Sequence, residues 1–120
     1  NYASMLIRRP PPGVASKHVW MSWGKGDSYS PETTLTATAH AAGLQVAAPV
    51  VTPIGLATDA RPITPGRVAG DGPTRFAAVF QYDLAGAADG HFATTTSPTA
   101  MAEWEAFLTS MAATGTPTVP

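Results

Sequence analysis

The sequence predicts an α/β fold with a mostly parallel sheet flanked by helices. Two strand patterns alternate with two helix patterns along the chain, and this order is typical of parallel sheets. Hydrophobic residues make up 44% of the 120 residues, enough for a packed core despite 12 prolines and 11 glycines. The length fits one domain or part of one.

The first half of the chain predicts one strand followed by one helix. Residues 17–24 are apolar on both alternating faces, as in a strand that is covered on two sides. A glycine-rich turn then leads to Asp27. Ser30 and Pro31 indicate a helix start, with Ser30 as the cap and Pro31 in the first helical position. The helix is expected to end at Gly43.

The middle of the chain is less regular. Residues 44–51 predict a short strand, although a proline within them weakens the pattern. Residues 51–75 are rich in proline and glycine, have no clear period, and predict a long loop or insertion. Residues 75–82 then predict a second long strand, which a loop connects to His91.

A second helix is predicted from Pro98 to about residue 113, with Ser97 as its cap. Its apolar residues recur at helical spacing and are expected to dock the helix onto the sheet. This predicted stripe consists of Met101, Trp104, Phe107, Leu108 and Met111. Glu103 and Glu105 lie off the stripe and are expected to face solvent.

Composition excludes several classes of function. The net charge is −1 and the basic residues are scattered, which argues against nucleic-acid binding. No cysteine is present, so disulfides, zinc ribbons and thiol nucleophiles are excluded. No apolar run approaches the length of a membrane span. His18, His40 and His91 lack the spacing of a metal motif, and no metal is expected.

Asp27 and His91 each follow a predicted strand. The carboxyl ends of parallel strands share one edge of a sheet, so these two side chains could meet there. An aspartate that accepts a hydrogen bond from an imidazole lets the other ring nitrogen act as a base. Asp83 and Asp89 also flank His91, but they are more typical of turns. The simpler interpretation is that Asp27 caps a turn and His91 is an ordinary loop histidine.

Two segments resemble the α/β-hydrolase family. Ser22-Trp23-Gly24-Lys25-Gly26-Asp27-Ser28-Tyr29-Ser30-Pro31 is similar to its acid loop, and Asp89-Gly90-His91-Phe92 is similar to its histidine loop. The resemblance spans nearly the whole chain, but only as the last third of that fold. It implies a serine hydrolase that cleaves small carboxylic esters, with Asp27 as triad acid and His91 as base. It implies no metal or organic cofactor.

The nucleophile of such a triad is not found in this sequence. The family's serine lies in a G-x-S-x-G turn that precedes the acid and the histidine. The nearest match, around Ser22, lacks the first glycine, and Ser22 lies in the strand that leads to Asp27. The chain starts at Asn1 rather than methionine. We therefore interpret residues 1–120 as the C-terminal portion of one hydrolase domain, completed by an upstream segment or a complementary chain that carries the serine.

Two other interpretations remain open. The chain could be a non-catalytic α/β interaction module, or a pseudo-enzyme that has lost its nucleophile. An Asp27 carboxylate oxygen within about 3 Å of one His91 ring nitrogen, together with a serine hydroxyl near the other nitrogen in the assembled protein, favours the enzyme, and a separation of Asp27 and His91 above about 8 Å excludes it. The 51–75 insertion is expected either at the rim of the active site or as a plain surface excursion. The composition, with few lysines and no cysteine, suits a secreted or periplasmic bacterial hydrolase.

Overall fold

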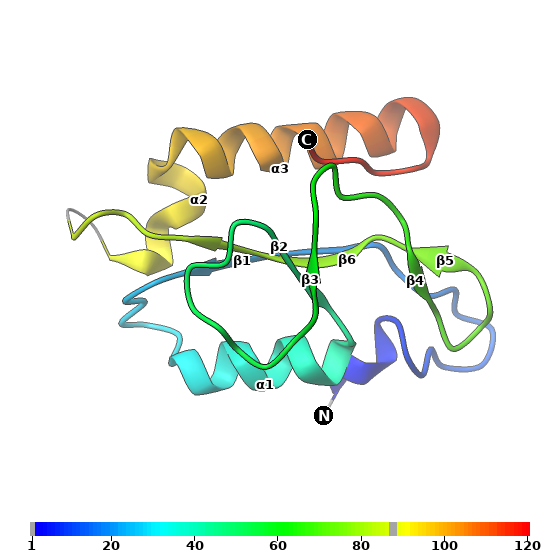
Figure 1. The fold of residues 1–120 in the computed structure, drawn as a ribbon. Helices are drawn as coiled ribbons and strands as arrows, with labels where there is room; N and C mark the ends of the chain where they lie inside the picture. The colour runs from blue at the N-terminus through cyan, green and yellow to red at the C-terminus, as the bar shows by residue number, and fades with distance from the viewer. Residues whose placement is uncertain (1, 87–88) are drawn as a thin grey trace.

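A computed structural model describes residues 2–86 and 89–120 (Figure 1). It confirms the predicted α/β fold, because four strands form a parallel sheet in the order β1-β6-β2-β3. The elements are η1 (Tyr2–Met5), β1 (Val19–Gly24), α1 (Glu32–Ala42), β2 (Gln45–Ala47), β3 (Thr58–Asp59), β4 (Arg67–Val68), β5 (Thr74–Arg75), β6 (Ala77–Tyr82), η2 (Gly90–Phe92), α2 (Ala93–Thr96) and α3 (Pro98–Thr114).

The helices cover both faces of the sheet. Helices α2 and α3 lie on one face, and α1 lies on the other face beside the short η1 turn (Figure 1). A hydrophobic core fills each interface. Phe76, Phe80 and Phe107 belong to the core under α3, and Trp23 and Val46 belong to the core over α1. Burial on both faces explains why β6 is buried at all of its positions.

Strands β1 and β6 place the two predicted loops at one edge of the sheet. They run parallel in a register that pairs Val19 with Ala77 and Gly24 with Tyr82. Both strands therefore end at the same level, and the residues that follow them emerge side by side.

The strand predicted over residues 75–82 divides in two. Arg75 ends β5 and Ala77 begins β6. Between them, the N–H of Phe76 donates to His18 Nδ1 at 2.9 Å. Burial lowers the pKa of His18, with a contribution from the Arg75 guanidinium, so the imidazole is favoured in the neutral form that can accept this bond.

Helix α1 begins one residue later than predicted, at Glu32 rather than at Pro31. Pro31 occupies the N-cap position, and no side chain caps the helix. The prediction that Ser30 caps it is wrong, because Ser30 lies one residue before the N-cap; its N–H donates to Asp27 Oδ1 at 2.7 Å. The predicted end is confirmed: Gly43 adopts a left-handed conformation with φ of 78°.

Helix α3 begins as predicted but presents a different face to the sheet. Ser97 caps it by accepting a hydrogen bond from the N–H of Ala100. Of the predicted docking stripe only Phe107 is buried, although the Trp104 ring also contacts Trp20 of β1 at a centroid distance of 5.2 Å. The other four members of the stripe are between 38% and 45% exposed: Met101, Trp104, Leu108 and Met111. The buried positions are Ala100, Glu103 and Phe107.

Glu103 is buried rather than solvated, which corrects a second expectation. The hydroxyl of Tyr82 donates to its carboxylate at 2.5 Å, and Arg61 pairs with the same carboxylate at 2.6 Å. Burial raises the pKa of Tyr82, which therefore stays neutral and donates. These two polar partners on the sheet side draw the glutamate inward, and the small Ala100 lets the helix approach closely.

The 51–75 segment is mostly irregular but contains strand pairs. It supplies the edge strand β3, which pairs with β2, and the antiparallel pair β4–β5. Because β5 immediately precedes β6, this pair lies at the opposite end of the sheet from the loops after β1 and β6 (Figure 1). Only the start of the segment reaches toward those loops, where Gln81 of β6 binds the N–H groups of Val51 and Thr52.

Candidate active site

The loops after β1 and β6 are tied together at the edge of the sheet. The N–H of Lys25 donates to the carbonyl of Tyr82 at 2.8 Å, and this bond extends the hydrogen-bonded pairing of β1 with β6 by one residue. The Lys25 ammonium also pairs with Asp83 at 2.8 Å. This ion pair is exposed, and its main consequence here is that Asp83 is engaged away from His91.

Gly24 and Gly90 bring the two loops into backbone contact. A Cβ atom on Gly24 would lie 2.0 Å from the carbonyl oxygen of Gly90, and one on Gly90 would lie 2.5 Å from the carbonyl oxygens of Gly24 and Lys25. No side chain fits at either position. The two glycines thus allow η2, which carries His91, to rest directly on the end of β1.

Asp27 and His91 meet within this contact. Nδ1 of His91 lies 3.3 Å from Oδ1 and 3.4 Å from Oδ2 of Asp27. The Asp27 side chain is 9% exposed, whereas the His91 side chain is 41% exposed. The carboxylate is therefore enclosed and the imidazole opens to solvent.

The acid loop fixes the orientation of Asp27. Its Oδ1 accepts hydrogen bonds from the N–H of Tyr29 at 2.9 Å and of Ser30 at 2.7 Å. These bonds form the turn before α1, as the simpler sequence interpretation expects. The same carboxylate also faces His91, so both descriptions of Asp27 hold at once.

Asp89 organises the histidine loop through hydrogen bonds to the backbone and to Ser28, and its carboxylate makes no hydrogen bond to the imidazole. Its Oδ1 accepts the N–H of His91 at 2.9 Å and the N–H of Ser28 at 3.1 Å. The Ser28 hydroxyl donates to its Oδ2, and this bond is the main reason that the pKa of Asp89 is lowered. Of the three aspartates near His91, the structure therefore brings Asp27 alone to the ring.

The second ring nitrogen of His91, Nε2, differs from Nδ1 in its contacts. Within residues 2–86 and 89–120, Nε2 has no hydrogen-bond partner. Ser28 is bound by Asp89. Ser22 lies inside β1 opposite Phe80, two residues before the strand ends, and is not beside the ring. Among the described residues, Asp27 and His91 thus form a carboxylate–imidazole pair, and no serine is bonded to Nε2 of the imidazole.

Two aromatic residues beside His91 were missed by the sequence patterns. The Tyr29 ring centroid lies 4.7 Å from that of His91, and the Phe92 ring lies 5.2 Å away. Exposed loop aromatics follow no periodicity, so spacing could not single them out. The only sequence signal is their position, two residues after Asp27 and one after His91.

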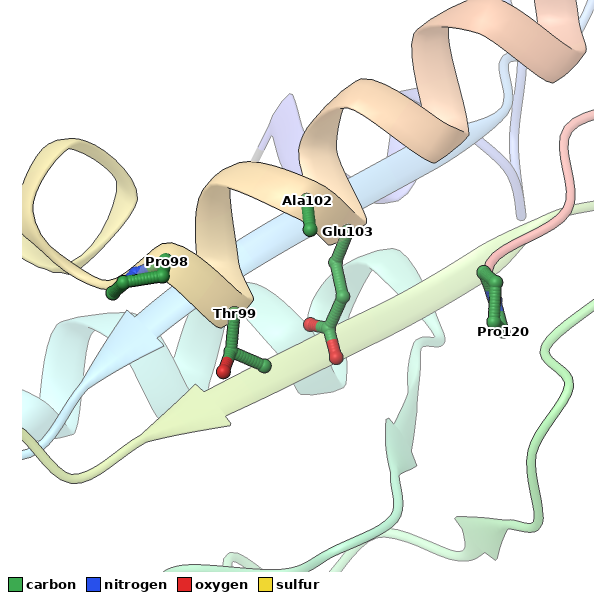
Figure 2. A pocket seen from close by; sticks show the side chains of 5 residues that line it. All are labelled: Pro98, Thr99, Ala102, Glu103 and Pro120. Atoms are coloured by element: carbon green, nitrogen blue, oxygen red, sulfur yellow. The ribbon is translucent and has the colours of Figure 1, made fainter.

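A separate pocket of about 470 Å³ lies beside α3 (Figure 2). Its lining consists of Pro98, Thr99, Ala102, Glu103 and Pro120. The Glu103 carboxylate points into it, but both carboxylate oxygens are already bound, one by Tyr82 and one by Arg61. The pocket therefore offers an apolar surface without a free acid or base.

Among residues 2–86 and 89–120, no three His, Asp or Glu side chains gather as metal ligands would. No helix of the described chain has the length and apolar character that crossing a membrane requires. No family model, curated protein or solved structure matches the sequence.

Proposed function

We propose that this chain supplies the acid and the base of a serine carboxylic ester hydrolase with an α/β-hydrolase-like fold. The observation that carries the proposal is the approach of Asp27 to Nδ1 of His91 at 3.3 Å. An acid that binds Nδ1 fixes the tautomer that leaves the Nε2 lone pair free to accept a proton. The His91 side chain is 41% exposed, and a base must be accessible in order to reach a nucleophile.

The chemistry follows from this geometry. Nε2 of His91 removes the proton of a serine hydroxyl as the oxygen attacks the ester carbonyl. Asp27 stabilises the imidazolium through Nδ1–H without taking that proton. The imidazolium then protonates the departing alkoxide, which leaves as the alcohol and yields an acyl-serine. Water, deprotonated by the same nitrogen, hydrolyses the acyl-serine to the acid and restores the serine.

We infer that the serine lies on a segment outside these 120 residues, and the unpaired edge of the sheet supports this inference. Strand β1 pairs with β6 on one side, and no strand of the described residues pairs on its other side. A further parallel strand added there would end at the same edge as β1, next to Asp27. The partner of the proposed enzyme is therefore the segment or chain that carries the nucleophile.

Hydrolysis of short p-nitrophenyl esters by the protein that includes this segment tests the proposal. His91→Ala should reduce kcat by about a thousandfold or more, and Asp27→Asn should reduce it to a similar extent. His40→Ala is the matched control, because His40 is an exposed histidine on α1 whose ring binds only the carbonyl of Ile54. A fluorophosphonate probe should label one serine outside residues 1–120. Unchanged activity in His91→Ala would reject the assignment of the base.

A second candidate, a non-catalytic interaction module, is favoured by one observation. Four large apolar side chains on α3 are exposed: Met101, Trp104, Leu108 and Met111. Such a patch is typical of a surface that binds another protein. This candidate predicts no ester hydrolysis and no fluorophosphonate labelling, whereas charged substitutions on the patch would abolish complex formation.

A further inference from the structure

Two aromatic side chains enclose the imidazole of His91 from different loops. The Tyr29 ring, from the acid loop, is tilted by 38° to the imidazole at a centroid distance of 4.7 Å. The Phe92 ring meets the imidazole edge-on at 5.2 Å and the Tyr29 ring at 5.7 Å. These ring contacts of Tyr29 and Phe92 link the two loops, in addition to the contact between Asp27 and His91.

The hydrogen bond to Asp27 alone holds the imidazole weakly. The distances of 3.3 Å and 3.4 Å are longer than the usual 2.7–3.2 Å of an N–H···O bond. The side chain of His91 is 41% exposed, so core packing does not restrain its rotation. A second restraint is therefore needed to keep Nδ1, rather than the carbon side of the ring, toward the carboxylate.

Tyr29 is well placed to supply that restraint. Its backbone N–H donates to Asp27 Oδ1 at 2.9 Å, so the residue is anchored to the same carboxylate. The side chain is 67% exposed, which shows that it does not fill the core. Within the described residues its hydroxyl makes no recorded hydrogen bond, and its contacts are the rings of His91 and Phe92.

We propose that Tyr29 is a positioning residue whose ring, together with Phe92, holds the His91 imidazole with Nδ1 directed at Asp27. This inference rests on the proposed function for its catalytic meaning, because the positioned group is the proposed base. The restraint comes from contact between rings, and the phenol hydroxyl takes no part. Phenylalanine should therefore replace tyrosine at this position, and alanine should not.

The direct test is NMR of the 120-residue chain at about pH 8.5, where a free histidine is neutral. Ring ¹⁵N shifts report which nitrogen of His91 carries the proton, and ring NOEs report its contact with residue 29. In the wild-type chain and in Tyr29→Phe, the proton should reside on Nδ1 and the ring NOEs should be present. In Tyr29→Ala, the two tautomers should mix. Tyr2→Ala, which removes an 83% exposed tyrosine on η1, should match the wild type.

Catalysis provides a second measurement in the protein that includes the nucleophile. Tyr29→Ala should lower kcat roughly two- to tenfold, the range expected for loss of one aromatic contact, with little change in KM. Tyr29→Phe should restore kcat. Tautomer populations in Tyr29→Ala that equal those of the wild type would overturn the positioning role, as would absent ring NOEs. Failure of the hydrolase proposal looks different: the wild-type protein would lack esterase activity, while the NMR comparison of the Tyr29 variants would keep its result.

Discussion

Gly24 and Gly90 are required by space rather than by backbone conformation. Neither has the positive φ that favours glycine elsewhere in the chain. Each would place a Cβ atom within 2.5 Å of the opposing backbone. Because backbone on both sides forms the obstacle, a side chain at either position could fit only if η2 moved away from β1, and His91 would move with it.

We therefore expect Gly24→Ala to separate the two loops. Overpacking of this kind costs about 1–3 kcal/mol of unfolding free energy, and the contact between Asp27 and His91 should be lost. Chemical denaturation measures the first effect, and the ring ¹⁵N shifts of His91 measure the second. Gly66→Ala is the matched control, because the nearest atom to its Cβ would be 3.9 Å away. Its unfolding free energy should change by less than about 0.5 kcal/mol. A Gly24→Ala variant with wild-type stability and ring shifts would contradict this account.

The residues of the site differ in how far sequence could identify them. The proximity of Asp27 and His91 was predictable, because parallel topology brings the ends of neighbouring strands together. Tyr29 was not found, since an exposed ring in a loop belongs to no periodic pattern. The contact of Gly24 with Gly90 joins residues far apart in the chain, and no local signal marks it.

At the scale of elements, the ends of helices were predicted better than their faces. Ser97 and Gly43 act within one helical turn, so their effects can be recognised locally. An amphipathic stripe shows only that one side of a helix is apolar. On α3 the apolar side lies exposed, while Glu103 turns inward because Tyr82 and Arg61 meet it there.

Glu103 and Glu105 look alike in sequence but should differ sharply in their effect on stability. Glu103→Ala would leave the Tyr82 hydroxyl and the Arg61 guanidinium without their partner. Loss of one member of a buried ion pair costs about 3–5 kcal/mol; because the Arg61 side chain is 27% exposed, we expect about 2–3 kcal/mol here. Glu105→Ala, on the exposed side of α3, should change stability by less than about 0.5 kcal/mol. Urea unfolding of both variants compares them, and equal losses would contradict the buried role of Glu103.

At the scale of the whole molecule, the two edges of the sheet differ. Beyond β6, strands β2 and β3 taper to three and two residues. On the other side, β1 is six residues long and carries the acid loop, yet its outer edge has no strand partner among the described residues. The exposed stripe of α3 lies on the same side of the molecule, since Trp104 contacts Trp20 of β1 at 5.2 Å. An unpaired long edge beside an apolar patch is typical of a surface that pairs with another strand or binds another protein.

Hydrogen exchange can show whether the sheet continues past β1. The N–H groups of Val19 and Lys25 donate to Phe76 and Tyr82, on the β6 side. Peptide groups alternate along a strand, so the N–H groups of Trp20 and Ser22 face the outer edge. In the isolated chain these two amides should exchange at least about tenfold faster than the amides of the odd-numbered residues of β1, which face β6. In the protein that includes the nucleophile segment, both should become protected.

The controls for this exchange experiment lie within the same molecule. Strand β6 pairs with β1 on one side and β2 on the other, so its amides should be protected in the isolated chain and in the longer protein alike. A dilution series identifies pairing between two copies of the chain, because such protection would weaken as the concentration falls. If Trp20 and Ser22 exchange equally fast with and without the added segment, the sheet ends at β1. The serine would then have to approach Nε2 of His91 from a loop rather than from an adjoining strand.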